Sequence, residues 1–211
     1  SLYLVLDARL RPEQLVLIGV GQAVASMLFE VPTGVVADAV SRRLSLIVAH
    51  VLVGLSMIAT ALSTSFGALM ATQILWGIGW TFASGADVAW ITDELDEGER
   101  APRLLAAQAR WKQIGALAGM VGFGGLAWVG GRVGAMLTAG GVMVALAAYV
   151  ATQFPERRFQ PATTRPVRRA FEVLKAGLTL ARRDVQLLIL FGATVLINGA
   201  SDSSGRLYPR Q

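Results

Sequence analysis

Long apolar runs alternate along the chain with short stretches in which the charged residues are concentrated. About 20 consecutive, mostly apolar residues are enough for an α-helix to cross a bilayer. Residues 44–86 contain no Asp, Glu, Lys or Arg, which is enough for two helices joined by a turn at 63–66, the second extending to about Trp90. The pattern predicts seven segments, five of them complete: the stub 2–6, then 14–37, the two helices in 44–90, 113–131, 133–155 and an incomplete one from 185.

The composition indicates an all-α, polytopic membrane protein. Of the 211 residues, 54% are hydrophobic and 16% are charged, whereas soluble domains carry roughly 25% charged residues. The absence of cysteine excludes disulfides and thiolate metal sites within these residues. The one histidine, His50, has no carboxylate beside it in sequence, so we expect no metal site and no cofactor.

The net charge of +5 would favour nucleic acid in a soluble protein, but here the basic residues flank apolar runs. Counting the segments places the loops near 38–43, 92–112 and 155–184 on one side of the membrane. That side holds 14 of the 19 Lys and Arg residues, and the other side holds the remaining 5. The positive-inside rule predicts that the first side is cytoplasmic. We therefore expect lipid, and no nucleic acid, as a partner.

The longest polar stretch, 155–184, has a pattern of its own. Its apolar residues recur at helical spacing, while its basic residues fall away from that stripe. The pattern favours a basic amphipathic helix lying in the membrane interface, and the alternative is a plain solvated linker. The predicted organisation is a helix bundle over 1–154, this loop over 155–183, and the start of a second bundle over 184–211.

The stretch "GVVADAVSRR" lies at the end of the second segment and covers the turn into the third. It resembles the turn motif of the major facilitator superfamily: a glycine, an aspartate four residues later, and a basic pair four and five residues after that. The matching residues are Gly34, Asp38, Arg42 and Arg43. The family usually adds a basic residue after the aspartate and a glycine before the pair, where this chain has Ala39 and Ser41.

The stretch "GADVAWITDEL" ends the fourth segment with acidic residues on the same side. In the family, an acidic residue at that place pairs with an arginine of the turn motif. The resemblance implies that Asp93 pairs with Arg42 and that the pair latches the cytoplasmic side while the outside is open. The alternative is topological: the basic residues simply hold the turn inside.

Two acidic residues, Glu30 and Asp87, fall within apolar segments. A charged side chain near the bilayer centre costs on the order of 2.5–3.5 kcal/mol, so we expect each to face the bundle interior, a cavity or a partner. Desolvation penalises the charged form of a carboxyl, which suits a group that cycles protons. Either residue could couple protons to transport, or it could be a structural carboxyl hydrogen-bonded to a neighbouring helix.

The fourth segment departs from the drug-exporting relatives in one respect. Many of them have an arginine four residues before a glycine of this segment, where this chain has Gln73 before Gly77. Trp76 and Trp80 could line a cavity for a lipophilic substrate or belong to helix packing and the interfacial belt. The glycine-rich stretch 115–125 partly resembles the family's antiporter motif without its proline, and its simpler interpretation is close helix packing.

"FEVPTG" and "SGADVAWITDEL" are similar to stretches of bacterial drug and metabolite exporters in that superfamily. The resemblance implies a secondary transporter of the inner membrane that exports a small organic compound, with protons as the coupling ion. It also implies a twelve-helix fold of which this chain is the N-terminal half, with a truncated first helix, so that a C-terminal half is a required partner. The alternatives are a non-transporting scaffold and an intramembrane hydrolase using Ser84 and His50.

Overall fold

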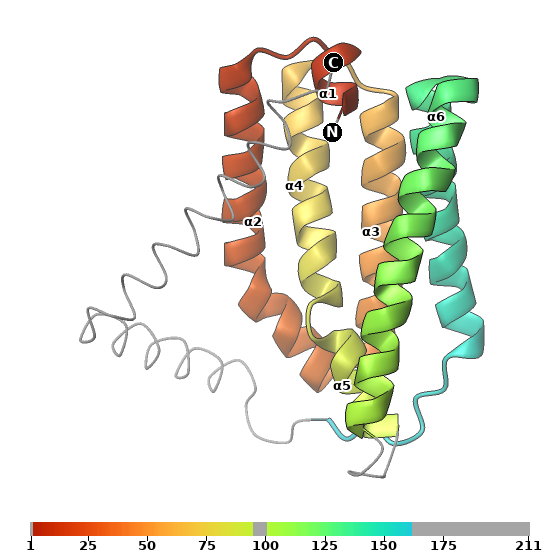
Figure 1. Cartoon of the computed structure of the whole chain (residues 1–211). Coiled ribbons are helices and arrows are strands. Elements are labelled where there is room, and N and C mark those ends of the chain that lie inside the picture. Colours follow the sequence, from red (N-terminus) through yellow and green to blue (C-terminus); the bar gives the residue numbers. More distant parts are fainter. Residues whose placement is uncertain (1, 95–100, 162–211) are drawn as a thin grey trace, which may run out of the picture.

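The computed structural model describes residues 2–94 and 101–161. Most of them are helical, and the long helices run side by side as a bundle (Figure 1). The predicted amphipathic helix beyond residue 161 and the predicted segment 184–211 lie outside the described residues. The helices are α1 (Leu2–Leu6), α2 (Pro12–Ala39), α3 (Arg42–Ala61), α4 (Phe66–Ala83), α5 (Ala86–Glu94) and α6 (Ala101–Gln153).

Four helical stretches in the described part of the chain are long and apolar enough to cross a membrane: Pro12–Ala39, Arg42–Ala61, Phe66–Glu94 and Arg103–Gln153. The last has 51 residues, which at 1.5 Å per residue is more than twice the roughly 30 Å of a hydrocarbon core. Gly131 divides it, with φ 79° and ψ 158°. This break confirms the predicted split between 113–131 and 133–155, and two crossings follow each other within α6.

The fourth segment differs from its prediction because it is not one continuous helix. α4 ends at Ala83, Gly85 has a positive φ of 76°, and α5 then runs to Glu94 rather than to about Trp90. Glycine adopts this left-handed conformation without a steric penalty. The break allows α5 to leave the axis of α4, at the lower end of the bundle in Figure 1.

The other predicted turns are present and have local causes. The Ser41 side chain caps α3 by accepting a hydrogen bond from the Leu44 N–H at 2.8 Å, and Ser65 occupies the same position before α4. Inside α2, Pro32 has no N–H to donate, and the Thr33 hydroxyl donates to the Phe29 carbonyl at 2.7 Å. The lower part of α2 is bent in Figure 1, as an internal proline commonly causes.

The bundle packs around two apolar clusters, one towards each end. The first joins α1, α2 and α4 through Leu4, Leu15, Ile18 and Leu69, and the second joins α2, α3, α5 and α6 through Ala37, Leu46, Ala86 and Val150. The first part of α6 is different because most of its residues are exposed. The interpretation of 115–125 as helix packing is not supported among the described residues, since an added Cβ at Gly115, Gly122, Gly124 or Gly125 would meet no atom within 4 Å.

The two ends of the bundle carry different polar contacts. At one end, the Arg132 guanidinium lies 2.5 Å from the Asp7 carboxylate and hydrogen-bonds to it. This hydrogen bond holds the pKa of Asp7 below its usual value. The α2–α3 turn, α5 and the chain after α6 meet at the opposite end, which we call the basic end after Arg42, Arg43, Arg157 and Arg158.

Candidate functional site

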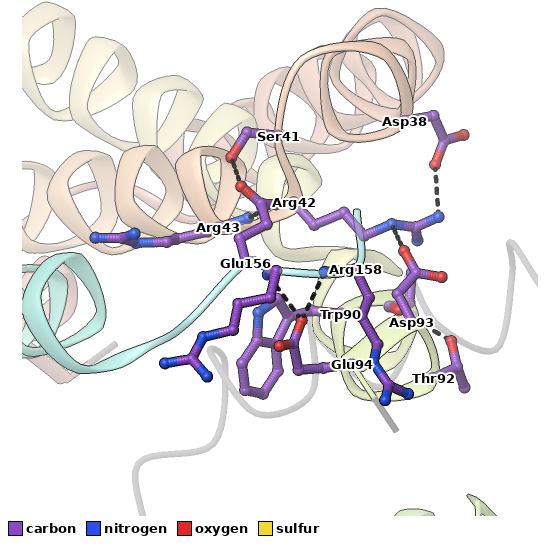
Figure 2. A network of polar contacts seen from close by, with 12 residues as sticks. Asp38, Ser41, Arg42, Arg43, Trp90, Thr92, Asp93, Glu94, Glu156 and Arg158 are labelled. Carbon is purple, nitrogen blue, oxygen red and sulfur yellow. Dashed lines mark hydrogen bonds and ion pairs between the residues drawn. The ribbon is translucent and has the colours of Figure 1, made fainter. Parts of the chain in front are cut away.

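The basic end brings together three segments that are distant in sequence (Figure 2). They are the α2–α3 turn, helix α5, and residues 154–158, which follow α6 and which we call the strap. Each segment contributes at least one charged side chain that contacts another segment. Several of these charges lie among the residues that the turn motif and the acidic stretch "GADVAWITDEL" single out.

Arg42 is the centre of the cluster. Its Nε atom lies 2.6 Å from Asp93 Oδ2, and its Nη2 atom lies 3.6 Å from Asp38 Oδ1. The Asp93 contact is an ion pair by distance, although the Nε–H is not aligned for a hydrogen bond. Only 18% of the Arg42 side chain is exposed, against 58% for Asp38 and 32% for Asp93. The pair that the resemblance predicts is therefore present, and it joins α3 to α5.

The other two motif residues have different surroundings. The Arg43 guanidinium donates through Nη2 to the Ala151 carbonyl, near the end of α6. Gly34 lies on α2, and a Cβ added there would meet no atom within 4 Å. The described contacts thus give Arg43 a role in joining α3 to α6, and they give no packing reason for a glycine at position 34.

Glu156 is a member of the cluster that the sequence patterns did not identify. Its carboxylate accepts a hydrogen bond from the Ser41 hydroxyl at 2.6 Å and another from the Arg43 backbone N–H at 3.0 Å. The first N–H groups of a helix have no partner within the helix, so a carboxylate there is stabilising. The available signal was an acidic residue directly after Pro155 at the end of an apolar segment, next to the pair Arg157 and Arg158.

The strap is also held by α5. The Glu94 carboxylate accepts hydrogen bonds from the backbone N–H groups of Arg157 and Arg158, at 3.2 and 3.4 Å. The Trp90 indole donates to the Pro155 carbonyl at 2.9 Å, and its ring stacks on Phe154 with centroids 4.4 Å apart. Two carboxylates therefore hold the strap: Glu156 of the strap binds α3, and Glu94 of α5 binds the strap.

Glu30 lies apart from this cluster, two residues before Pro32 on α2. Its Oε1 atom accepts a hydrogen bond from the Ser84 hydroxyl at 2.8 Å, at the break between α4 and α5. The expectation that Glu30 has a partner is confirmed, but its side chain is exposed rather than enclosed by the described bundle. Because Ser84 bonds to Glu30 and His50 Nδ1 lies 2.6 Å from the Leu46 carbonyl, these contacts give no support to a Ser84–His50 dyad.

Asp87 is not an isolated acid. Its Oδ2 atom lies 2.5 Å from Lys112 Nζ and accepts a hydrogen bond from Gln108 Nε2 at 3.0 Å, and both partners belong to the first part of α6. Its side chain is 26% exposed. The nearby cation compensates the carboxylate, so this geometry matches the structural interpretation of Asp87.

The remaining predicted residues lie on α4 and differ in burial. Gln73 is buried, and its Nε2 atom donates to the Thr60 hydroxyl of α3 at 3.3 Å, next to a hydrogen bond between Thr60 and Thr72. Trp76 is half-buried, and 65% of Trp80 is exposed. Gln73 is thus covered by α3, whereas most of Trp80, two turns further along α4, is exposed.

Comparison with known proteins points to one family. A family model described as Major Facilitator Superfamily matches residues 2–205, nearly the whole chain. Neither the search of curated proteins nor that of solved structures found a match. Members of this superfamily are typically transporters, and several membrane-spanning helices are present in the described residues. The chain belongs to the major facilitator superfamily and is a multi-pass membrane transporter protein.

Proposed function

We propose that this chain forms part of a secondary active transporter that exports a small organic compound in exchange for protons. The transporter works by alternating access in a bacterial inner membrane, with the basic end in the cytoplasm, where the positive-inside rule puts the side with more Lys and Arg. The observation that carries the proposal is the 2.6 Å contact between Arg42 Nε and Asp93 Oδ2. It joins α3 and α5 at one end of the bundle. A latch that holds one arrangement of the helices and opens in the other would make such a contact.

The two carboxylates around Arg42 have unequal roles. Asp93 is closer to the guanidinium and less exposed than Asp38, so its contact is less screened by water. Exposed ion pairs contribute about 0–1 kcal/mol, and an ion pair that is partly buried is screened less by water and salt. Asp93 therefore supplies most of the free energy that keeps the latch closed. Asp38, at the end of α2, orients the Arg42 guanidinium.

Glu30 is the proposed coupling group. Its Oε1 atom accepts a hydrogen bond from Ser84 while the side chain is exposed, and this contact joins α2 near Pro32 to the break before α5. Protonation would weaken the acceptor for Ser84 and so loosen the contact between α2 and the end of α4. Asp87 is a poorer candidate because Lys112 already compensates its charge.

The test uses the full-length protein in inside-out vesicles with an imposed proton gradient and a pH-sensitive dye. Adding ethidium, a lipophilic cation, is expected to collapse part of the gradient as protons leave in exchange. Glu30→Gln should abolish this response, Asp93→Asn should reduce it more than Asp38→Asn, and Asp87→Asn should largely retain it. Glu13→Gln, an exposed acid at the start of α2, is the control. A normal response in both Glu30→Gln and Asp93→Asn would contradict the mechanism.

A further inference from the structure

We propose that Glu156 is a positioning residue: it anchors the strap, residues 154–158, so that Arg42 is held in place for Asp93. The inference rests on the proposed function, because it concerns the same latch at the basic end. It assigns a task to a segment outside the turn motif, namely the first residues of the loop after α6.

The first step is the contact between Glu156 and α3. Glu156 accepts hydrogen bonds from the Ser41 hydroxyl and the Arg43 N–H, and Ser41 in turn accepts from the Leu44 N–H. Ser41, Arg43 and Leu44 flank Arg42 at the start of α3. A carboxylate at this position is favoured by the free N–H groups and by the helix dipole. It fixes the backbone from which the Arg42 side chain projects.

The second step is the contact between the strap and α5. Glu94 binds the N–H groups of Arg157 and Arg158, and Trp90 holds Phe154 and Pro155. Asp93 lies between Trp90 and Glu94 in the same short helix. The strap therefore touches the backbone or side chains next to both members of the Arg42–Asp93 pair: Figure 2 shows Glu156 beside Ser41 and Arg43, and Arg158 beside Glu94.

The third step compares the two connections between α3 and α5, which are the Arg42–Asp93 ion pair and the strap. The ion pair links two long side chains, and holding them in one geometry costs conformational entropy. The strap links the first turn of α3 to α5 by several hydrogen bonds and a ring stack, so it reduces the movement of the two elements before the ion pair forms. Losing Glu156 should separate α3 from the strap and loosen the pair, although neither charge of the pair is changed.

Ser45 provides a reporter for this loosening. It lies one turn after Arg42 on α3, its side chain is 0% exposed, and the 211 residues contain no cysteine. Ser45→Cys, in full-length protein from which any cysteine outside these 211 residues has been replaced, can therefore be labelled with N-ethylmaleimide in native membranes. The labelling rate measures how often the start of α3 opens to water. The rate is compared among otherwise wild-type protein, Glu156→Ala, Glu156→Asp, Asp93→Asn and Glu13→Gln.

We expect Glu156→Ala to raise the labelling rate about tenfold, as for the loss of a helix cap. Glu156→Asp, which keeps the carboxylate, should give an intermediate rate, and Glu13→Gln should leave it unchanged. If Glu156→Ala does not accumulate in the membrane, Glu94→Ala removes part of the attachment of the strap to α5 and should also raise the rate. The wild-type rate in the strap variants, with a raised rate in Asp93→Asn, would overturn the role of the strap while leaving the latch intact. The wild-type rate in Asp93→Asn as well would overturn both.

Discussion

Gly54 on α3 and Gly140 on the second part of α6 face each other without room for a side chain. A Cβ added to Gly54 would lie 2.8 Å from the Gly140 carbonyl oxygen, and one added to Gly140 would lie 2.7 Å from the Gly54 carbonyl oxygen. Small residues allow helix backbones to approach in this way inside membranes. The contact fixes α6 against the helix that carries Arg42.

Gly54→Ala and Gly140→Ala are therefore expected to destabilise the bundle. Overfilling a packed contact costs about 1–3 kcal/mol, and here the obstacle is backbone rather than a flexible side chain. The measurement is the midpoint of thermal unfolding in detergent. Gly141→Ala is the matched control, because a Cβ at the neighbouring Gly141 meets no atom within 4 Å. If Gly54→Ala and Gly140→Ala unfold at the same midpoint as Gly141→Ala, the packing argument is wrong.

The break in α6 gives a second prediction. Gly131 has φ 79° and ψ 158°, a region that is essentially restricted to glycine. Gly131→Ala should cost about 1–3 kcal/mol of stability through backbone strain, although no neighbouring atom obstructs a Cβ there. Gly130→Ala, one residue earlier and without a positive φ, should be tolerated. Comparing the urea midpoints of the two variants in mild detergent tests the strain at position 131. The strain argument fails if Gly130→Ala lowers the midpoint more than Gly131→Ala does.

The Asp87–Lys112 pair gives a third prediction, which tests the structural interpretation of Asp87. Asp87→Asn leaves Lys112 without its carboxylate and should lower stability, whereas the double variant Asp87→Asn with Lys112→Gln should lose less than the two single changes together. The coupling free energy should be about 0.2–1 kcal/mol, because Lys112 is 63% exposed. A double-mutant cycle on thermal unfolding measures it. Strictly additive losses would show that the pair does not interact.

The Asp7–Arg132 pair gives a prediction for pH. Hydrogen bonding to Arg132 lowers the pKa of Asp7 in the folded chain, so the stabilisation is fully present above the pKa of the unfolded chain. It is lost as the pH falls through the lower folded value. Asp7→Asn should therefore reduce the unfolding midpoint by the same small amount at pH 6 and pH 8. This difference should shrink in about 1 M salt, because the pair is exposed and screened. A difference that grows between pH 6 and pH 8 would contradict the assignment.

Several features of the site could be predicted from the sequence because they depend on local spacing. The turn motif placed Asp38 and Arg42 four residues apart, and the family resemblance, rather than spacing, pointed to Asp93 as the partner of Arg42. Glu156 could not be predicted in the same way. It is 113 residues from Arg43, and no local pattern states which loop reaches the start of α3. The same reason explains why the compensation of Asp87 by Lys112 was missed.

The sequence by itself determined the membrane class and, within the described residues, the apolar segments and the turns between them, but not the break between α4 and α5. These follow from one physical requirement, that each crossing needs about 20 apolar residues and charges collect where the crossing ends. Only the tertiary structure decided which helices touch, where Glu30 and Asp87 find partners, and how the strap joins α3 to α5. Such contacts depend on how each helix is rotated about its axis, and hydrophobicity specifies this rotation weakly when lipid surrounds the bundle, because lipid tails are as apolar as the side chains that pack.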